Sequence, residues 1–297
     1  MLNDSDPYIR FLLSRKNRLV YCSLYPGNGG DLLIRKGTLK LLSDLGIHTT
    51  AEPCEADVIL YPGGCPTMYP QVMACISESL HTFFGAELVV GPATFRLGYT
   101  DWVGTFNRSA SPGVALFARD PDSFMNLRKA RLRKSIKIGL SHDPALYLRD
   151  SEWLDAQKSA VANEYVLAAF RRDHEMNTGI PGEWVKALRA VLPKGTFKKL
   201  THWFKKRARR RKVDIARKLA DSKLPLNEVD VSHLDFDSFV ETVRCSKEVH
   251  TDRLHTMLLA AMLDKPVFAY RTSYGKLEGV YEQSLKGWTK VTFVSRL

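Results

Sequence analysis

The sequence predicts an α/β protein with two units, each a parallel β-sheet covered by helices on both faces. Three observations support this prediction. Short aliphatic and β-branched runs recur along the chain, glycine, proline or asparagine bounds them, and most are followed by a segment with helical spacing. Near-continuous apolar strands alternating with helices are typical of parallel sheets. The length of 297 residues, 44% of them hydrophobic, suits two medium-sized domains and excludes fibrous and wholly disordered proteins.

The first unit is expected over residues 1–150. Its strands are predicted at residues 18–25, 56–61, 86–91, 114–119 and 136–140. The first crossover is the clearest, because Asp31 is placed to cap a helix with a leucine-rich face and Gly46 marks the end of that helix.

The second unit is expected over residues 151–297. Its strands are predicted at residues 164–170, 229–233, 244–250 and 266–270, and its helices at about 182–192, 235–243 and 252–263. Two such units in tandem predict a cleft that faces the carboxyl ends of both sheets, where open α/β sheets bind ligands.

Positive charge is concentrated in one segment. The chain has a formal net charge of +12, and residues 198–218 alone hold eleven Lys or Arg and one Asp. Apolar residues such as Trp203 and Phe204 lie between these cations, a pattern typical of a helix on an anionic membrane surface. The alternative is a solvated helix whose Trp203 and Phe204 pack on the domain. No nucleic-acid-binding motif is present, so nucleic acid is not predicted as a partner.

Neither secretion nor membrane spanning is expected. The five cysteines form no C-x-x-C pair, the N-terminal residues have no signal-peptide pattern, and no run of about 18 apolar residues lacks charge. A cytoplasmic location is therefore predicted. The eight histidines show none of the spacings of a zinc site, so no metal is predicted.

Glycine-rich loops follow the first two predicted strands. The first loop contains Asn28, Gly29 and Gly30, and the second contains Gly63 and Gly64. Glycine lets a ligand approach the backbone closely, and a helix N-terminus favours an anion. The spacings match neither a dinucleotide fingerprint nor a Walker loop. A substrate crevice is therefore predicted, with simple helix-starting turns as the alternative.

The stretch 244–276 carries the strongest chemical signal. A strand runs into Thr251, predicted as the N-cap of a helix with Arg253 and His255 in its first turn. Free N–H groups and the helix dipole favour an anion there, and arginine adds bidentate recognition of carboxylate or phosphate. Lys276 adds a positive group after the next strand. The alternative is that Arg253 pairs with a nearby carboxylate and His255 is structural.

Several motifs in order resemble the polysaccharide pyruvyl transferase family, whose members build a pyruvate ketal on a sugar from phosphoenolpyruvate. They are GNGGDLLI, ADVILYPGG, VVGPATF, ARDPDSF, HDPAL, YVLAAFRRDHE and VHTDRLHTMLLAAMLDKPVFAYRTSYGK. The resemblance covers roughly residues 18–285. Asp264 departs from it, because the family often has glycine there. The resemblance implies a GT-B-like fold, in which two Rossmann-like domains face a cleft, with the acceptor on the N-terminal side and the donor on the C-terminal side.

The resemblance also implies roles for single residues. Phosphoenolpyruvate carries up to three negative charges within a few ångström, which requires cations and N–H donors. The implied donor-binding residues are Arg253, Leu254 at the helix N-terminus, Arg171, Arg172 and Lys276. His255 is the implied acid/base residue, and Asp31 is the second catalytic candidate, with helix capping as its alternative. The residues expected at the acceptor or in loops around it are Asn28, Gly29, Gly30, Gly63, Gly64, Arg119, Ser123 and Asp143.

The implied partners are phosphoenolpyruvate as donor, no further cofactor, and a glycan acceptor on a polyprenyl lipid. Residues 198–218 would then hold the enzyme on the inner face of the membrane. Two other functions remain open. One is a nucleotide-sugar-dependent GT-B glycosyltransferase, although no residue for ribose or base is identifiable. The other is a binding protein with a degenerate site that holds RNA or a membrane through residues 198–218.

Overall fold

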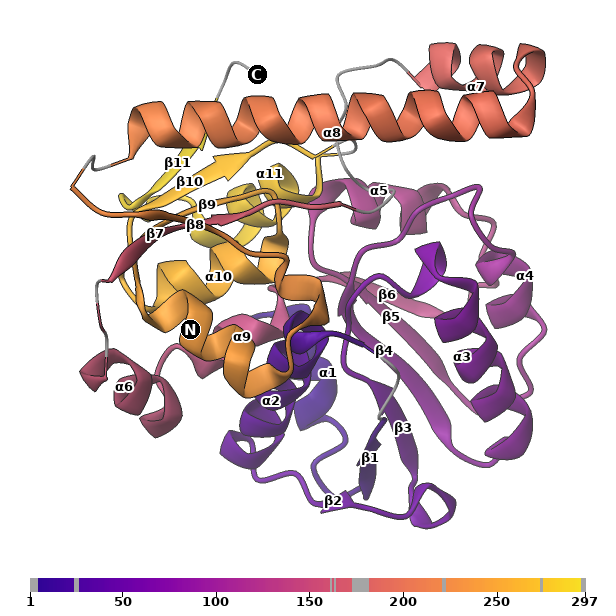
Figure 1. Ribbon diagram of the computed structural model, residues 1–297. Coiled ribbons are helices and arrows are strands. Elements are labelled where there is room, and N and C mark those ends of the chain that lie inside the picture. Colours follow the sequence, from indigo (N-terminus) through magenta and orange to yellow (C-terminus); the bar gives the residue numbers. More distant parts are fainter. Residues whose placement is uncertain are drawn as a thin grey trace. The chain divides into compact units, whose positions relative to one another are not determined.

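The computed structural model describes residues 5–23, 27–160, 162, 164–172, 182–220, 223–272 and 275–294 (Figure 1). The chain divides into two compact units. The first comprises Met1–Asp155 with Gly279–Lys286, and the second comprises Ala156–Glu278 with Gly287–Leu297. Each unit contains its own parallel sheet, which confirms the predicted fold class. The acceptor-side and donor-side roles of residues 1–150 and 151–297 stay predictions.

The sheet of the first unit has the strand order β2-β1-β3-β4-β5-β6, and all neighbouring strands are parallel. Its strands are β1 (Val20–Cys22), β2 (Thr49–Thr50), β3 (Val58–Tyr61), β4 (Glu87–Ala93), β5 (Val114–Ala118) and β6 (Lys137–Leu140). The five runs predicted for this half correspond to β1, β3, β4, β5 and β6. The two-residue β2 is too short to give a periodic pattern.

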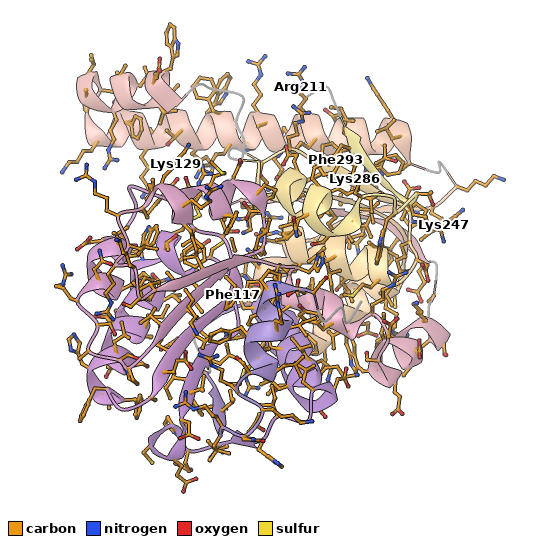
Figure 2. All side chains as sticks on the ribbon, turned by 180° about the vertical axis from the view of Figure 1, so that it is seen from behind. Phe117, Lys129, Arg211, Lys247, Lys286 and Phe293 are labelled. Carbon is orange, nitrogen blue, oxygen red and sulfur yellow. The ribbon has the colours of Figure 1, made fainter. Side chains whose placement is uncertain are left out.

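Helices cover both faces of this sheet, as Figure 1 shows. They are α1 (Pro7–Leu13), α2 (Gly29–Asp44), α3 (Pro70–Thr82), α4 (Trp102–Asn107) and α5 (Pro121–Lys129). Because side chains alternate along a strand, Val89 packs with α1 and α2, whereas Leu88 and Val90 pack with α3 and α4. On the α1 side, the ring of Phe117 lies 5.0 Å from that of Tyr8 (Figure 2).

The sheet of the second unit has the order β11-β10-β9-β7-β8 and is also parallel. Its strands are β7 (Tyr165–Ala169), β8 (Leu226–Glu228), β9 (Ser246–Thr251), β10 (Val267–Tyr270) and β11 (Val291–Val294). The strand predicted at residues 229–233 is wrong, because the strand lies just before it. Asp230 instead caps a 3-10 turn, Val231–His233, by accepting from the N–H of Ser232.

The remaining helices are α6 (Glu152–Ser159), α7 (Gly182–Val191), α8 (Lys194–Leu219), α9 (Phe236–Arg244), α10 (Leu254–Met262) and α11 (Lys276–Val280). The basic segment 198–218 lies entirely within α8. Thr251 is not the N-cap of α10 as predicted. It is the last residue of β9, and Arg253 holds the N-cap position. No helix in the described ranges is long and apolar enough to cross a bilayer.

Both sheets share one topological feature. The first strand of each lies between the second and third, since β1 is flanked by β2 and β3, and β7 by β8 and β9. The chain therefore reverses its direction of travel across the sheet beside β1 and beside β7. Ligands of open α/β sheets bind at the carboxyl ends of the strands at such switch points. The switch points here are β1/β3 and β7/β9.

Candidate active site

Three predicted donor-binding arginines lie at the switch point of the second sheet. Arg171 and Arg172 follow β7, and Arg253 follows β9, so all three leave the same edge of the sheet. The hydroxyl of Thr251 donates to the carbonyl of Ala169 at 2.8 Å and joins the ends of the two strands. The structure thus brings together residues that are about 80 positions apart in the sequence.

Asp230 links two of these arginines. Its Oδ1 accepts from Nη2 of Arg253 at 2.7 Å, and its Oδ2 lies 3.4 Å from Nε of Arg172. Burial raises the pKa of Asp230, but hydrogen bonds from Ser232 and the charges of Arg253 and Arg172 hold that pKa below its usual value. The carboxylate is therefore ionised at neutral pH. It fixes the direction of Arg253, whose side chain is only 9% exposed.

Arg253 therefore pairs with a nearby carboxylate, as one of the two interpretations of the sequence expected. Binding of a donor by Arg253 stays a prediction, because an arginine that a carboxylate orients still presents other N–H groups. Sequence reasoning missed Asp230, since it fell in a predicted strand.

Asp252 ties the site to the basic helix. Its Oδ1 accepts from the backbone N–H of Arg171 at 2.7 Å, and its Oδ2 accepts from Nζ of Lys212 at 2.6 Å. The side chains of Asp252 and Lys212 are each 1% exposed. Lys212 belongs to α8 and reaches the end of β7 from there. In the sequence, nothing distinguishes it from the other cations of its run.

His255 is the second residue of α10. It is partly exposed, whereas the other eight residues of that helix, all of them described, are buried. His250 in β9 contrasts with it, because its ring is fully buried, contacts Tyr270 and Glu248, and has a pKa lowered by burial. Of the two histidines in the motif, His255 is thus the one that reaches the surface.

The other two predicted donor-binding residues lie at the same edge of the sheet. The side chain of Leu254 is buried in the core, so Leu254 offers an anion only its backbone N–H at the start of α10. Lys276 begins α11 after β10, and its N–H donates to Thr272 Oγ1 at 3.2 Å. Residues 273–274 of the predicted S-Y-G-K motif lie outside the described residues.

At the β1/β3 switch point, the first glycine loop begins α2. Asn28 is the N-cap and accepts from the N–H of Gly30 at 2.8 Å, while Oδ2 of Asp31 accepts from the N–H of Asn28 at 3.0 Å. The two side chains form a capping box, so Asn28 and not Asp31 is the N-cap, and Asp31 takes part in the cap as the third residue of α2. Gly29 and Gly30 are the first residues of α2. Pro26, at the start of this loop, lies outside the described residues.

The second glycine loop follows β3. Gly63 and Gly64 have φ values of 143° and 89°, a region that favours glycine. A Cβ on Gly63 would lie 2.6 Å from the carbonyl oxygen of Pro92. The carbonyl of Gly64 accepts from the N–H of Thr94 at 2.8 Å. These glycines therefore have a structural reason to be glycine, and contact with an acceptor stays a prediction.

Arg119, Ser123 and Asp143 are fully buried in the first unit. Nη1 of Arg119 donates to Oδ2 of Asp143 at 2.7 Å, and Ser123 donates to Asp120 at 2.7 Å. Burial lowers the pKa of Arg119, but the neighbouring Asp143, Cys65 and Asp120 together outweigh burial, so that pKa lies above its usual value. The contacts join the loops that follow β5 and β6. Substrate contact by these three residues stays a prediction.

Among the described residues, no three His, Cys, Asp or Glu side chains lie close enough together to bind a metal ion. At the second switch point, the described groups are three arginines, two of them paired with Asp230, a helix N-terminus and a partly exposed histidine. The first switch point offers mainly backbone groups and uncharged loops.

Comparison with known proteins gives the family and the fold. The profile of the polysaccharide pyruvyl transferase family matches residues 28–274. A solved structure of a functionally uncharacterized protein from Klebsiella pneumoniae is 21% identical, with all of both chains covered and a TM-score of 0.64, and so has the same fold. No curated protein sequence matches the chain.

More distant similarities are to UDP-GlcNAc 2-epimerases. The enzyme from Methanocaldococcus jannaschii, solved with UDP-GlcNAc and UDP, is 13% identical, with 93% of this chain and 88% of that chain covered and a TM-score of 0.41. The enzyme from Neisseria meningitidis is 12% identical, with coverages of 88% and 84% and a TM-score of 0.40.

Proposed function

Since the chain belongs to the polysaccharide pyruvyl transferase family, we propose that it transfers pyruvate from phosphoenolpyruvate to two hydroxyl groups of one sugar, as a ketal. The observation that carries the proposal is the meeting of Arg171, Arg172 and Arg253 at the β7/β9 switch point. A compact trianion needs several cations within a few ångström, and guanidinium forks match both carboxylate and phosphate.

Donor binding is assigned to the second unit. Arg253 and Arg171 bind the carboxylate and the phosphate, Arg172 and Lys276 add positive charge, and the N–H of Leu254 contributes the positive end of the α10 dipole. Asp230 holds Arg253 in place through the 2.7 Å bond described above. A fork that is already oriented loses less conformational freedom when the donor binds.

His255 supplies the proton that starts the reaction. Protonation of the vinyl carbon makes C2 of phosphoenolpyruvate electrophilic, and the two sugar hydroxyls form two C–O bonds to it as the C–O bond to phosphate breaks. Two hydroxyl protons are released. One replaces the proton given to the methyl carbon, and the other leaves on inorganic phosphate. Histidine exchanges protons near neutral pH, and His255 is the partly exposed residue of α10.

The acceptor is assigned to the first unit. A sugar is an uncharged polyol, and the loops with Asn28, Gly29, Gly30, Gly63 and Gly64 offer it backbone groups rather than charge. Asp31 is the candidate base for an acceptor hydroxyl, through the carboxylate oxygen that does not serve the N–H of Asn28. Arg119, Ser123 and Asp143 support the neighbouring loops from within the core.

The acceptor glycan is carried on a polyprenyl lipid at the cytoplasmic leaflet, as part of exopolysaccharide or cell-surface glycan synthesis. Support for membrane contact comes from α7 and α8. Trp184 and Trp203 are 66% and 50% exposed, and Arg207 and Arg211 lie exposed on α8. Exposed tryptophan beside arginine is typical of a helix that lies at an anionic membrane surface.

Ligand-induced stabilisation tests the donor. A ligand at 100 times its Kd stabilises a protein by about 2.7 kcal/mol, which raises Tm by several degrees. Phosphoenolpyruvate is expected to raise Tm, and to raise it more than UDP-glucose, UDP-galactose and GDP-mannose do. Release of inorganic phosphate that depends on added glycan then tests turnover. Stabilisation by the nucleotide sugars alone contradicts the proposal and favours a glycosyltransferase.

A further inference from the structure

One face of α8 changes its chemistry halfway along the helix. Val213 and Ala216 are buried against the second unit. Residues three or four positions apart share a helix face, so the same face continues through Arg209, Lys206, Lys205 and His202. In its C-terminal half this face packs on the core, and in its N-terminal half it carries cations. Neither a solvated helix nor a membrane helix requires such a division.

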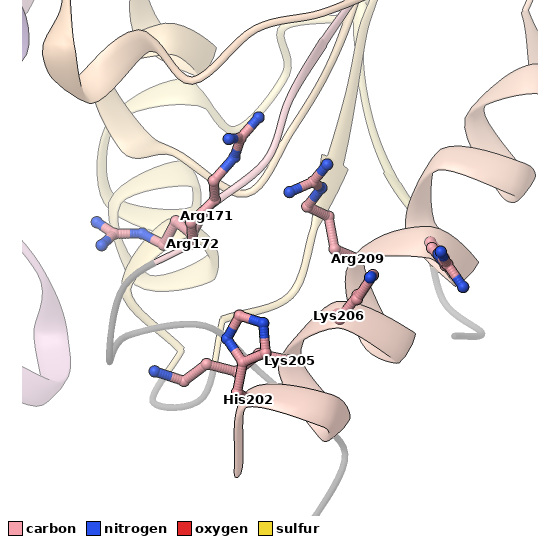
Figure 3. Close-up of a pocket in the computed structure, with 7 residues that line it drawn as sticks. Arg171, Arg172, His202, Lys205, Lys206 and Arg209 are labelled. Carbon is pink, nitrogen blue, oxygen red and sulfur yellow. The ribbon is translucent and has the colours of Figure 1, made fainter. Parts of the chain in front are cut away.

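These cations line a pocket of about 380 Å³ in the second unit (Figure 3). Its lining residues are Arg171, Arg172, His202, Lys205, Lys206, Arg209 and Arg210. Figure 3 shows the first two entering from the end of β7 and the others from α8. Among the described residues, no acidic side chain lines the pocket. We refer to it as the α8 pocket.

The two walls of the α8 pocket are fixed to each other. The buried carboxylate of Asp252 holds the N–H of Arg171 on one wall and Nζ of Lys212, in α8, on the other, at 2.7 and 2.6 Å. Arg209 is held by Glu228 of β8 at 2.5 Å. A set of cations that stays together without its ligand is typical of a built binding site.

Charge in the α8 pocket is only partly balanced. Arg209 pairs with Glu228 and Arg172 with Asp230, but within the described chain no carboxylate pairs with Lys205, Lys206 or Arg210. Like charges at such close range repel one another, which destabilises the protein without a ligand. The arrangement is explained if an anion occupies the pocket during function.

The shape and size of the α8 pocket indicate which anion it binds. Lys205 and Arg210 lie five positions apart on α8, about 7.5 Å along the helix axis, so the cations form a row rather than a compact cluster. A volume of about 380 Å³ is also near the lower end for small-molecule sites and exceeds the need of a single phosphate. Two linked phosphates fit such a row better than phosphoenolpyruvate does, whose charges lie within a few ångström.

We propose that the α8 pocket binds the diphosphate group of an organic diphosphate ester. Arg253 and His255 do not line it, so it adjoins the candidate donor site and shares only the wall of Arg171 and Arg172. Resting on the proposed function, this diphosphate is the group through which the acceptor glycan is attached to its carrier. The pocket then positions the carrier of the acceptor glycan.

Calorimetric titration at about 0.15 M salt tests the inference, with methyl diphosphate, geranyl diphosphate, UDP, inorganic phosphate and phosphoenolpyruvate as probes. The pocket variant is Lys206→Gln/Arg210→Gln. Its matched control is Arg207→Gln/Arg211→Gln, with the same spacing and charge loss on the opposite side of α8, where Figure 2 shows Arg211. Methyl diphosphate is expected to bind at least about tenfold more weakly to the pocket variant and within about threefold of wild type to the control.

Three results overturn the inference. They are equal losses in the two double variants, inorganic phosphate binding as tightly as methyl diphosphate, and a proportional loss of phosphoenolpyruvate affinity in the pocket variant. Geranyl diphosphate binding more tightly than both methyl diphosphate and UDP supports a lipid carrier, whereas preference for UDP overturns that assignment. Binding of diphosphates without any binding of phosphoenolpyruvate rejects the proposed function and keeps the pocket.

Discussion

The two switch points have the same topology and opposite chemistry. At β1/β3, glycine loops and a capping box leave mostly backbone groups and no described cluster of cations. At β7/β9, three arginines and Asp252 follow the strands, and Asp230 contacts two of these arginines from the loop after β8. One strand order therefore carries two kinds of chemistry, because the residues after the strands set the chemistry of the edge. An uncharged sugar suits the first edge, and a trianion suits the second.

The largest effect is expected from the aspartate that holds the second edge together. Asp252→Ala removes the partner of the buried Lys212 ammonium, and loss of one member of a buried pair costs about 3–5 kcal/mol. Asp31→Ala, at the first edge, removes only part of a helix cap, worth about 1 kcal/mol. Urea unfolding of both variants measures this difference in the free energy of unfolding. Similar costs would mean that the two edges are held in the same way.

A second prediction separates proton transfer by His255 from donor binding by the arginines at the same edge. His255→Gln keeps the size of the side chain and one hydrogen-bonding group but removes acid/base capacity, so kcat is expected to fall about 100-fold or more. Donor affinity should stay nearly unchanged, because Arg253 and Arg171 remain. Steady-state rates paired with calorimetry of phosphoenolpyruvate binding separate the two effects. If His255→Gln loses donor binding in proportion to rate, His255 is a binding residue and the proton comes from elsewhere.

Membrane contact through α8 is part of the proposed function, and it depends on exposed positive charge. Arg207 and Arg211 lie exposed on α8, and each cation near an anionic bilayer contributes about 1 kcal/mol. Sedimentation with vesicles rich in anionic lipid is therefore expected to weaken by about 2 kcal/mol, roughly 30-fold, in Arg207→Gln/Arg211→Gln. About 0.5 M salt should release the wild-type protein. Undiminished sedimentation of the variant would assign membrane contact to another surface or to none.

The smallest effect is expected at Asp31. Asp31→Asn keeps an oxygen that accepts from the N–H of Asn28, so the cap survives and stability should change by less than about 0.5 kcal/mol. If Asp31 is also the acceptor-side base, kcat falls about tenfold. The free energy of unfolding and kcat of this one variant separate the two roles. Full activity with full stability would make Asp31 a helix cap alone.

Much of the fold was predictable because strands and helices leave local patterns. Apolar runs located most strands of both sheets, and the basic run located much of α8. Two failures had physical causes that local pattern does not show. Asp230 caps a 3-10 turn through its bond to Ser232 directly after β8, and Thr251 is the last residue of β9, bonded to Ala169, so the N-cap position falls on Arg253.

The unusual backbone conformation at Asp264 could be predicted from the family motif. Asp264 stands where the family often has glycine, and its φ of 59° makes it the one non-glycine residue with a positive φ among those described. Aspartate tolerates this region better than most residues, which explains how it replaces glycine. By contrast, the pairing of Lys212 with Asp252 could not be predicted, because only the tertiary fold distinguishes a buried lysine from the other cations of its run.

The most direct test of the donor assignment is calorimetric titration of phosphoenolpyruvate into the wild-type protein and Arg253→Lys. Lysine keeps the positive charge but loses the planar fork that Asp230 orients, so the Kd is expected to rise about tenfold or more. Binding of methyl diphosphate to the same variant serves as the control for folding and should be unchanged. An unchanged Kd for phosphoenolpyruvate in Arg253→Lys would contradict the assignment of the β7/β9 switch point as the donor site.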